Sequence, residues 1–248
     1  MNSNLQFVLQ PGGVLTGSMR VPGDKSISHR SIMLGALAEG VTEVYGFLQG
    51  EDSLNTLRCF RRMGVQIEGP EVLGAGRLRI RGVGLHGLKK PDETLWLGNS
   101  GTSMRLMSGI IAGQDFDAVM EGDASLSRRP MRRVTEPLAL MGARIDTQEG
   151  GRPPLHVHGG SALKGIHYAM PMASAQVKSC VLLAGLYAEG ETCVTEPAPT
   201  RDHTERMLPG FGYEVRRTTG EGGVSTVCLH GGGKLTATAI DVPADISS

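Results

Sequence analysis

The feature of the sequence that most constrains the fold is a pattern that occurs three times. Each copy is a helical segment that ends with a bulky residue and a glycine, and then enters a stretch rich in β-branched residues. The copies are residues 56–67, 135–145 and 204–215. Their glycines are Gly64, Gly142 and Gly212. Glycine readily adopts the left-handed conformation that commonly ends a helix. A repeat interval of about 75 residues predicts several similar supersecondary units.

A second helical pattern precedes each copy and also ends at a glycine. These patterns cover residues 26–40, 101–113 and 174–190. Short β-branched runs follow them at residues 42–45, 117–120 and 192–195. We therefore predict an α/β fold of three αβαβ-type units, packed as one globule with helices inside and sheets outside. The repeat runs from Val21 to about Val242, so we place no domain boundary within it.

The three upstream helices start alike, with a small residue followed one turn later by a cation. The pairs are Ser26 with Arg30, Gly101 with Arg105, and Ser174 with Lys178. A cation in the first turn opposes the helix dipole. The free N–H groups of a helix start, in contrast, favour an anion. The pattern predicts an anion site where the three starts converge; the alternative is that each basic side chain points into solvent.

Two loops add basic residues to a chain that is neutral overall. Lys25 lies just before the first helix, and residues 127–133 hold four arginines. Basic and acidic residues both number 25, and aromatic residues make up only 4%. This balance disfavours nucleic acid and anionic membranes as partners. A small, multiply charged ligand fits better, because guanidinium groups suit carboxylate or phosphate and lysine acts as a movable point charge.

The cysteines and the apolar segments bear on the compartment. Cys59, Cys180, Cys193 and Cys228 form no C-x-x-C pair, and we predict buried free thiols in a reducing compartment. The sequence has no apolar stretch of 18 residues, and its first ten residues lack the features of a secretion signal. We expect a cytoplasmic protein without a membrane partner.

Other candidate motifs are weak. The phosphate-binding pattern G-x-x-x-x-G-K-[ST] does not occur. His156 and His158 alternate on a predicted strand, but without a nearby third ligand we predict no metal site. Asp202, His203 and Glu205 are a possible acid–base group, although a capping role for Asp202 or Thr204 is favoured.

Five separated motifs resemble those of a known family. They are VPGDKSISHR at 21–30, LGNSGTSMR at 97–105, EGDASLSRRPMR at 121–132, PMASAQVKSCVLL at 171–183 and PTRDHTE at 199–205. Together they resemble the bacterial EPSP synthases (3-phosphoshikimate 1-carboxyvinyltransferases). The match runs in order through nearly the whole chain, which makes it specific.

The resemblance implies a fold of two similar domains that close over substrate. Each domain is an inside-out, barrel-like array of three βαβαββ units, with helices buried and sheets outside. Residues 21–242 would form the substrate-binding domain, with repeats at roughly 21–95, 96–165 and 166–242. Residues 1–20 would belong with the second domain, and residues 243–248 would begin the crossover to it. Because that domain supplies the acid–base groups, we expect this chain alone to be inactive, and the full-length enzyme to be a monomer.

The resemblance also implies the reaction. The carboxyvinyl group of phosphoenolpyruvate moves to the 5-hydroxyl of 3-phosphoshikimate, in the shikimate pathway of aromatic amino-acid biosynthesis, with no cofactor and no metal. One alternative is an enzyme similar to UDP-N-acetylglucosamine carboxyvinyltransferase. That family typically has a reactive cysteine in the loop corresponding to residues 123–131, where this chain has none. Another alternative is a non-catalytic anion-binding half-domain.

The resemblance carries site residues over by motif. Lys25 would be catalytic and lie between the two substrates. The residues expected to bind 3-phosphoshikimate are Lys25, Ser26, Arg30, Ser174, Ala175, Gln176, Thr200 and Arg201. Those expected to bind phosphoenolpyruvate are Lys25, Asn99, Gly101, Arg129 and Gln176, with Arg105 supporting the loop.

Two positions bear on glyphosate, an inhibitor that resembles phosphoenolpyruvate. Ala175 stands where many members have serine, and with Arg201 it resembles a subgroup that includes tolerant enzymes. Gly101, however, keeps the small residue typical of sensitive members. We expect sensitivity, because a side chain at this position would act on the inhibitor directly.

Overall fold

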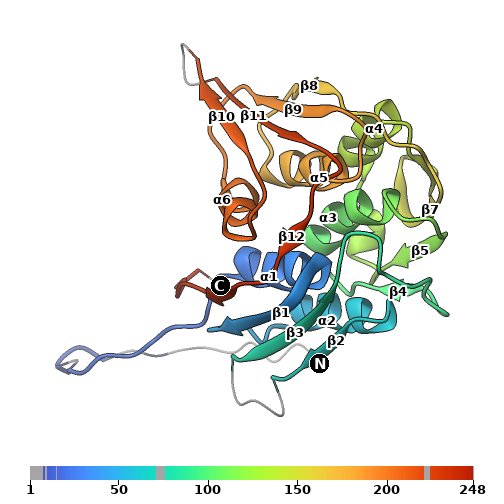
Figure 1. Cartoon of the computed structure of the whole chain (residues 1–248). Helices are drawn as coiled ribbons and strands as arrows, with labels where there is room; N and C mark the ends of the chain where they lie inside the picture. Colours follow the sequence, from blue (N-terminus) through green and yellow to red (C-terminus); the bar gives the residue numbers. More distant parts are fainter. Residues whose placement is uncertain (1–7, 9, 15, 71–75, 221–223, 248) are drawn as a thin grey trace.

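The computed structural model describes residues 8, 10–14, 16–70, 76–220 and 224–247. Its strands form three mixed sheets, which surround a group of central helices (Figure 1). The first sheet has the order β12-β1-β3-β2, and β13 also pairs with β1. Its strands are β1 (Ala38–Tyr45), β2 (Gln66–Glu68), β3 (Leu78–Val83), β12 (Leu235–Thr236) and β13 (Ala239–Asp241).

The other two sheets have an equivalent order, β4-β5-β7-β6 and β8-β9-β11-β10. Their strands are β4 (Leu95–Trp96), β5 (Ala118–Glu121), β6 (Arg144–Gln148), β7 (Arg152–His158), β8 (His167–Ala169), β9 (Glu191–Glu196), β10 (Arg216–Thr219) and β11 (Ser225–His230). In each sheet a short strand pairs in parallel with the strand that follows a central helix, and the remaining pairs are antiparallel. The first sheet obtains its parallel strands, β12 and β13, from the far end of the chain.

The central helices are α1 (Lys25–Leu37), α3 (Gly101–Ala112) and α5 (Ala175–Gly185). They are buried on all sides beyond their first turns. Small residues allow α3 and α5 to pack closely: a Cβ added at Gly109 would lie 2.3 Å from the carbonyl oxygen of Cys180. Because the backbones of the two helices touch at Gly109, no larger residue fits there.

The remaining helices are half-buried. They are α2 (Glu51–Arg62), α4 (Arg132–Leu140) and α6 (His203–Gly210), with a short 3-10 helix η1 (Leu126–Arg128). Each of the three α-helices is followed by a glycine with a positive φ, at Gly64 (87°), Gly142 (100°) and Gly212 (77°). The prediction of three glycine-terminated helices is therefore confirmed.

One hydrophobic core, which extends from Ile32 to Val242, takes residues from all three sheets. The structure confirms an α/β fold with mixed sheets. Over the described residues the three sheets do not join edge to edge, so no closed barrel is formed.

The prediction of four free thiols is wrong for two of the cysteines. A disulfide joins Cys193 on β9 to Cys228 on β11, whereas Cys59 and Cys180 are free and buried as predicted. The antiparallel register places Cys193 directly opposite Cys228, with 4.1 Å between their Cα atoms. The two cysteines are 35 residues apart in the sequence, and no motif spacing indicates that their strands become neighbours.

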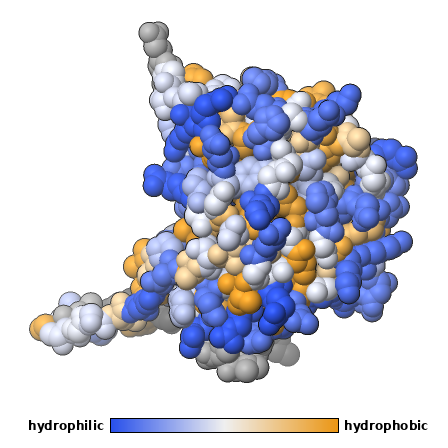
Figure 2. Space-filling view, in the orientation of Figure 1, coloured by the Kyte–Doolittle hydropathy of each residue, from blue (hydrophilic) through white to orange (hydrophobic). Residues whose placement is uncertain are grey.

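The described residues before Val21 form an arm that extends away from the globule (Figures 1 and 2). Val8, Val14 and Met19 are exposed there. Arg20 is the point of attachment, since its guanidinium forms an ion pair of 2.7 Å with Asp241. Within the described ranges, no helix has the length and apolar character needed to cross a bilayer.

Candidate functional site

The starts of the three central helices are capped by side chains. Asp24 accepts a hydrogen bond from the backbone N–H of Ile27 at the start of α1, at 2.6 Å. Ser100 caps α3 and Ser174 caps α5 in the same way. Each cap leaves other N–H groups of the first turn without a helical partner. The helix starts predicted from sequence are therefore correct to within one residue.

The starts of α3 and α5 are joined by side chains. Arg105 Nη1 donates to Gln176 Oε1 at 2.9 Å, and Gln176 Nε2 donates to Thr102 Oγ1 at 3.0 Å. Arg129, from the loop after η1, donates to Asn99 Oδ1. A Cβ added at Gly101 would lie 2.7 Å from Arg105 Nη1. The structure thus brings together four residues predicted to bind phosphoenolpyruvate, Asn99, Gly101, Arg129 and Gln176.

This group carries an excess of positive charge, and we call Gly101, Arg105 and Arg129 the open cluster. In the described part of the chain neither guanidinium forms an ion pair with a carboxylate; their hydrogen bonds go to neutral oxygens. Burial lowers the pKa of Arg105, and the nearby charges of Arg129 and Arg133 lower it further. Cations held close together without acidic partners favour binding of an anion.

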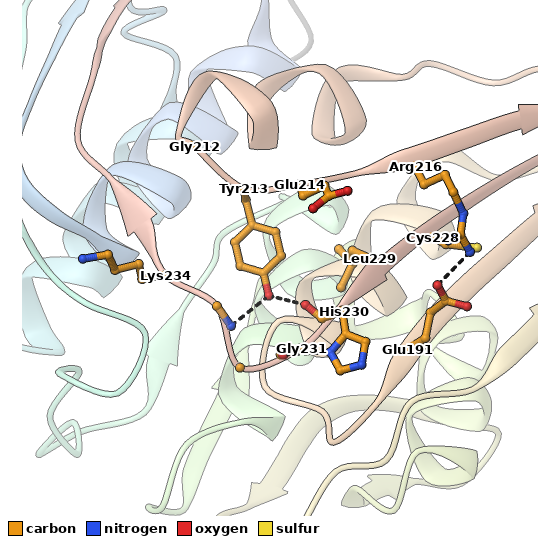
Figure 3. Close-up of a pocket in the computed structure, with 12 residues that line it drawn as sticks. Glu191, Gly212, Tyr213, Glu214, Arg216, Cys228, Leu229, His230, Gly231 and Lys234 are labelled. Carbon is orange, nitrogen blue, oxygen red and sulfur yellow. Dashed lines mark hydrogen bonds and ion pairs between the residues drawn. The ribbon is translucent and has the colours of Figure 1, made fainter.

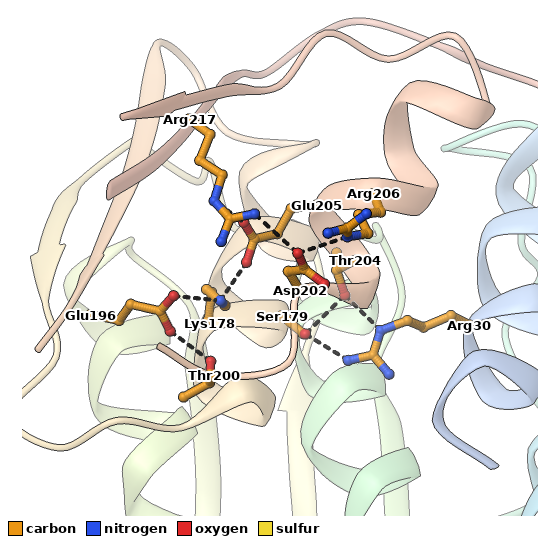
Figure 4. Close-up of polar contacts among 10 residues, drawn as sticks. All are labelled: Arg30, Lys178, Ser179, Glu196, Thr200, Asp202, Thr204, Glu205, Arg206 and Arg217. Atoms are coloured by element: carbon orange, nitrogen blue, oxygen red, sulfur yellow. Dashed lines mark hydrogen bonds and ion pairs between the residues drawn. The ribbon is translucent and has the colours of Figure 1, made fainter. Parts of the chain in front are cut away.

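Arg30 connects three helices (Figure 4). Its Nε donates to Thr204 Oγ1 and its Nη2 to Ser179 Oγ, both at 2.7 Å, while Nη1 donates to the carbonyl of Ser26 at 2.9 Å. The residue is 3% exposed. Burial lowers its pKa to about 10, and the charge of Arg201 adds to this effect. Arg30 is thus a structural link between α1, α5 and α6, and it lies near the predicted phosphate-binding Arg201.

The other predicted residues occupy the same ends of the helices with different exposure. Lys25 is half-exposed and forms an ion pair of 3.3 Å with Asp52 of α2. Arg201 is exposed, whereas Ser26, Ala175 and Thr200 are half-buried. The Thr200 hydroxyl donates to Glu196 Oε2 at 2.6 Å, so it is already engaged within the chain.

Lys178 does not have the role that the repeated pattern predicts. It is 1% exposed and forms ion pairs with Glu196, at 2.9 Å, and with Glu205 (Figure 4). A buried ammonium between two carboxylates is not available to a ligand. Lys178 therefore does not supply the cation that the repeated pattern predicts for an anion site at the start of α5. The solvent-facing alternative is not correct either, because the charge is neutralised inside the protein.

Asp202 occupies the N-cap position of α6, as favoured from sequence, but its side chain does not cap the helix. Its carboxylate accepts hydrogen bonds from Arg206, at 2.7 Å, and from Arg217, at 3.0 Å (Figure 4). Arg217 also lies 3.5 Å from Glu205. The acidic residues of this motif therefore hold α6 against β10.

A buried polar chain that sequence reasoning missed supports the start of α3. His29 Nδ1 lies 2.8 Å from Thr56 Oγ1, which lies 2.6 Å from Ser103 Oγ; that hydroxyl contacts the capping Ser100 at 2.7 Å. Burial lowers the pKa of His29 to about 3, with further contributions from Arg30 and Lys25. The imidazole is therefore neutral. The only sequence signal was the position of His29 inside the motif that contains Lys25.

His156 and His158 do have a third potential ligand nearby, contrary to the expectation from sequence. Asp117 lies beside His156 and His158 and gives this pair a third potential ligand. A different feature, a surface pocket of about 560 Å³, is lined by Tyr213, Arg216 and glycines 231–233 (Figure 3). It contains none of the residues that were predicted to bind substrate.

Comparison with known proteins identifies the family. The sequence model described as EPSP synthase (3-phosphoshikimate 1-carboxyvinyltransferase) matches residues 9–248. The chain belongs to the EPSP synthase family. This confirms the resemblance carried by the five motifs.

Individual relatives with high sequence identity carry the name of the same family. A protein of Hydrogenovibrio crunogenus named 3-phosphoshikimate 1-carboxyvinyltransferase is 68% identical over 248 residues, which are 100% of this chain and 55% of that protein. One of the same name from Methylococcus capsulatus is 70% identical over 247 residues, again 55% of its length. The solved EPSP synthase of Acinetobacter baumannii superposes with a TM-score of 0.87 at 63% identity, over 93% of this chain and 50% of that one. The chain thus spans about half the length of the relatives it matches.

Proposed function

We propose that this chain forms the substrate-holding half of a 3-phosphoshikimate 1-carboxyvinyltransferase. The observation that carries the proposal is the open cluster, in which Arg105 and Arg129 lie beside Gly101 without acidic partners. The reaction brings together two substrates that both carry phosphate and carboxylate groups. Fixed cations are needed to hold such anions in contact. In a chain of zero net charge, local clusters of this kind must supply them.

The proposed division of roles follows the two groups of residues. Phosphoenolpyruvate would bind at Asn99, Gly101, Arg129 and Gln176. 3-Phosphoshikimate would bind at Ser26, Arg30, Ser174, Ala175, Gln176, Thr200 and Arg201, and Lys25 would lie between the substrates. The 5-hydroxyl oxygen of 3-phosphoshikimate attacks the central carbon of phosphoenolpyruvate while its methylene carbon gains a proton. The resulting adduct then releases inorganic phosphate, and loss of a methyl proton restores the double bond.

We also propose that the domain is built from three repeated units. The equivalent strand orders of the three sheets support three βαβαββ units around α1, α3 and α5, in an inside-out arrangement. Residues 21–242 would form this domain, and residues 1–20 and 243–248 would connect it to a second domain. We expect the complete enzyme to be a cytoplasmic monomer.

The chain's match to about half the length of its relatives favours a second candidate, binding without turnover. An assay of phosphate release by the 248-residue chain distinguishes the two, with and without the remaining half of a relative added as a separate polypeptide. We expect no turnover alone and restored turnover in the mixture. Turnover by the chain alone would refute its inactivity, whereas failure to bind 3-phosphoshikimate in calorimetry would refute the proposed function.

The assignment of Arg129 can be tested in the same mixture. Arg129→Gln should raise the KM for phosphoenolpyruvate by about tenfold or more, the usual effect of losing a charge-assisted contact. Arg128→Gln is the matched control, because it removes an equal charge from an exposed neighbouring residue. An equal effect of both substitutions would show that only the general field of the loop matters.

A further inference from the structure

A second group of chemically active side chains lies on the sheet β4-β5-β7-β6. His156 and His158 alternate along β7, so both project from the same face of the sheet. Ala118 of β5 pairs with Val157, which places the preceding Asp117 level with His158. The side chains are 41% exposed for His156, 16% for His158 and 50% for Asp117. Solvent therefore reaches this group directly.

The distances match those of a metal site. Asp117 Oδ2 lies 3.4 Å from His156 Nε2 and 3.6 Å from His158 Nδ1, and all three ligand atoms lie within 4.8 Å of one another. Ligands bound tetrahedrally to zinc at about 2.1 Å are separated by about 3.4 Å. One ion could therefore contact all three atoms with only small side-chain movements.

Neighbouring groups orient the potential ligands. Asp117 Oδ1 accepts the N–H of Gly159 at 2.9 Å, which directs Oδ2 toward the imidazoles. Arg144 Nη2 lies 3.3 Å from His158 Nδ1, and a guanidinium can only donate, so Nδ1 carries the lone pair. The proton is then on Nε2, which donates to Asp146 Oδ2 at 2.7 Å. A carboxylate that holds the far nitrogen of a ligating histidine is a common outer contact of zinc sites.

Asp117, His156 and His158 lie far from the open cluster. Asp117 follows the end of α3, whereas Gly101 begins it, and 12 helical residues span about 18 Å. A surface pocket of about 310 Å³ adjoins Asp117 and His156 and is also lined by residues 90–94. It leaves room for water as a fourth ligand. The site therefore does not rest on the proposed transferase function.

We propose that Asp117, His156 and His158 bind a divalent ion of the zinc class, through Oδ2, Nε2 and Nδ1 respectively. Two imidazoles and a carboxylate are the donor set that suits zinc and its neighbours rather than magnesium or calcium. Binding replaces the contact between Arg144 and His158, and the Arg144 charge opposes the cation. It cross-links the ends of β5 and β7.

The test uses the 248-residue chain, freed of metal by chelation and kept under non-reducing conditions, with zinc chloride added in a calorimeter. We expect one ion per chain, and at least about tenfold weaker binding in Asp117→Asn and in His156→Gln. Asp146→Asn should weaken binding by about tenfold through loss of the outer contact. Arg144→Gln should strengthen it, a result that a group of simple surface ion pairs would not produce.

His167→Gln is the matched control. It removes a histidine from the other group of potential ligands, His167, Glu191 and Cys193, in which the Cys193 sulfur is held in the disulfide. This variant should bind zinc as the unmodified chain does. Cobalt added in place of zinc should give visible absorption bands that disappear in His156→Gln. Absence of binding, or binding unchanged in both Asp117→Asn and His156→Gln, would overturn the proposal, and circular dichroism would verify that each variant is folded.

Discussion

The starts of α3 and α5 look alike in sequence and are both capped by a serine, but their cations have different partners in the structure. Each has a small residue at its start and a cation one turn later, Arg105 in α3 and Lys178 in α5. Lys178 lies in a buried cluster, defined by Lys178, Glu196 and Glu205, where two carboxylates neutralise it. Arg105 lies in the open cluster, where its partners are neutral. The same local pattern thus yields a structural ion network in one unit and a candidate anion site in another.

The largest effect is expected from breaking the buried cluster. Lys178→Met should lower the free energy of unfolding by about 3–5 kcal/mol, because it leaves the buried Glu196 without a cation and Glu205 with only the longer contact to Arg217. Arg105→Met, the matched change in α3, should alter stability by much less, since it removes one of several like charges. Urea denaturation of both variants measures the difference. Equal losses would show that the two cations have the same role.

The next largest effect is on ligand binding. Here we expect a substitution in the open cluster to matter more than one in the buried cluster. Arg105→Met should weaken binding of phosphoenolpyruvate, measured by calorimetry in the presence of 3-phosphoshikimate, by about 1.5–3 kcal/mol. A conservative probe of the other cluster is Glu196→Gln, which keeps the shape of the side chain but replaces one of the two oxygens that accept from Lys178 and Thr200 with an NH2 donor. It should change stability but leave phosphoenolpyruvate affinity within about twofold. If Glu196→Gln weakens binding as much as Arg105→Met does, the clusters are functionally coupled.

This contrast also explains what could be predicted from the sequence. The glycine-terminated helices were predictable because a helix end is determined by residues within one turn. The open cluster was predictable from the motifs that contain Gly101 and Arg129. The partners of Lys178, the Cys193–Cys228 pair and the position of Asp117 beside two histidines were not. They depend on which strands become neighbours, and no residue spacing in a single sequence encodes that pairing.

A smaller effect is expected in the pH dependence of stability. It concerns His29, which belongs to the buried polar chain that supports the start of α3. The folded-state pKa of His29 is about 3, below its ordinary value of 6.5, because the imidazole is buried beside Arg30 and Lys25. A depressed histidine pKa means that the unfolded chain binds the proton more readily. Stability is therefore fully present above pH 6.5 and declines as pH falls toward 3, at up to about 1.4 kcal/mol per pH unit.

Denaturation at pH 7, 6 and 5 measures this slope, and His29→Gln should reduce it. His203 contributes in the same direction, because burial lowers its pKa too. The difference in slope between the unmodified chain and His29→Gln isolates the contribution of His29. If stability depends on pH equally in the unmodified chain and in His29→Gln, then His29 gains a proton without unfolding the protein. The buried polar chain from His29 to Ser100 would then tolerate a charge.

The smallest expected effect comes from Gly101→Ala, which adds a methyl group to the open cluster. The new Cβ would lie 2.7 Å from Arg105 Nη1 and 3.1 Å from Arg129 Nη1. Both atoms are at the ends of flexible side chains, so the guanidiniums can move and the helix can stay intact. We expect a change in stability within about 0.5 kcal/mol. Gly210→Ala is the matched control, because a Cβ there meets nothing within 4 Å.

The effect on ligands should depend on their length. In enzyme restored by the other half of a relative, the methyl should raise the KM for phosphoenolpyruvate a few-fold. The inhibition constant of glyphosate, which is longer, should rise considerably more. The ratio of the two constants is the measurement, since displacement of Arg105 and Arg129 alone would weaken both anions alike and leave it unchanged. A ratio equal to that of the unmodified enzyme would therefore show that Gly101 shapes the guanidiniums but does not border the ligand.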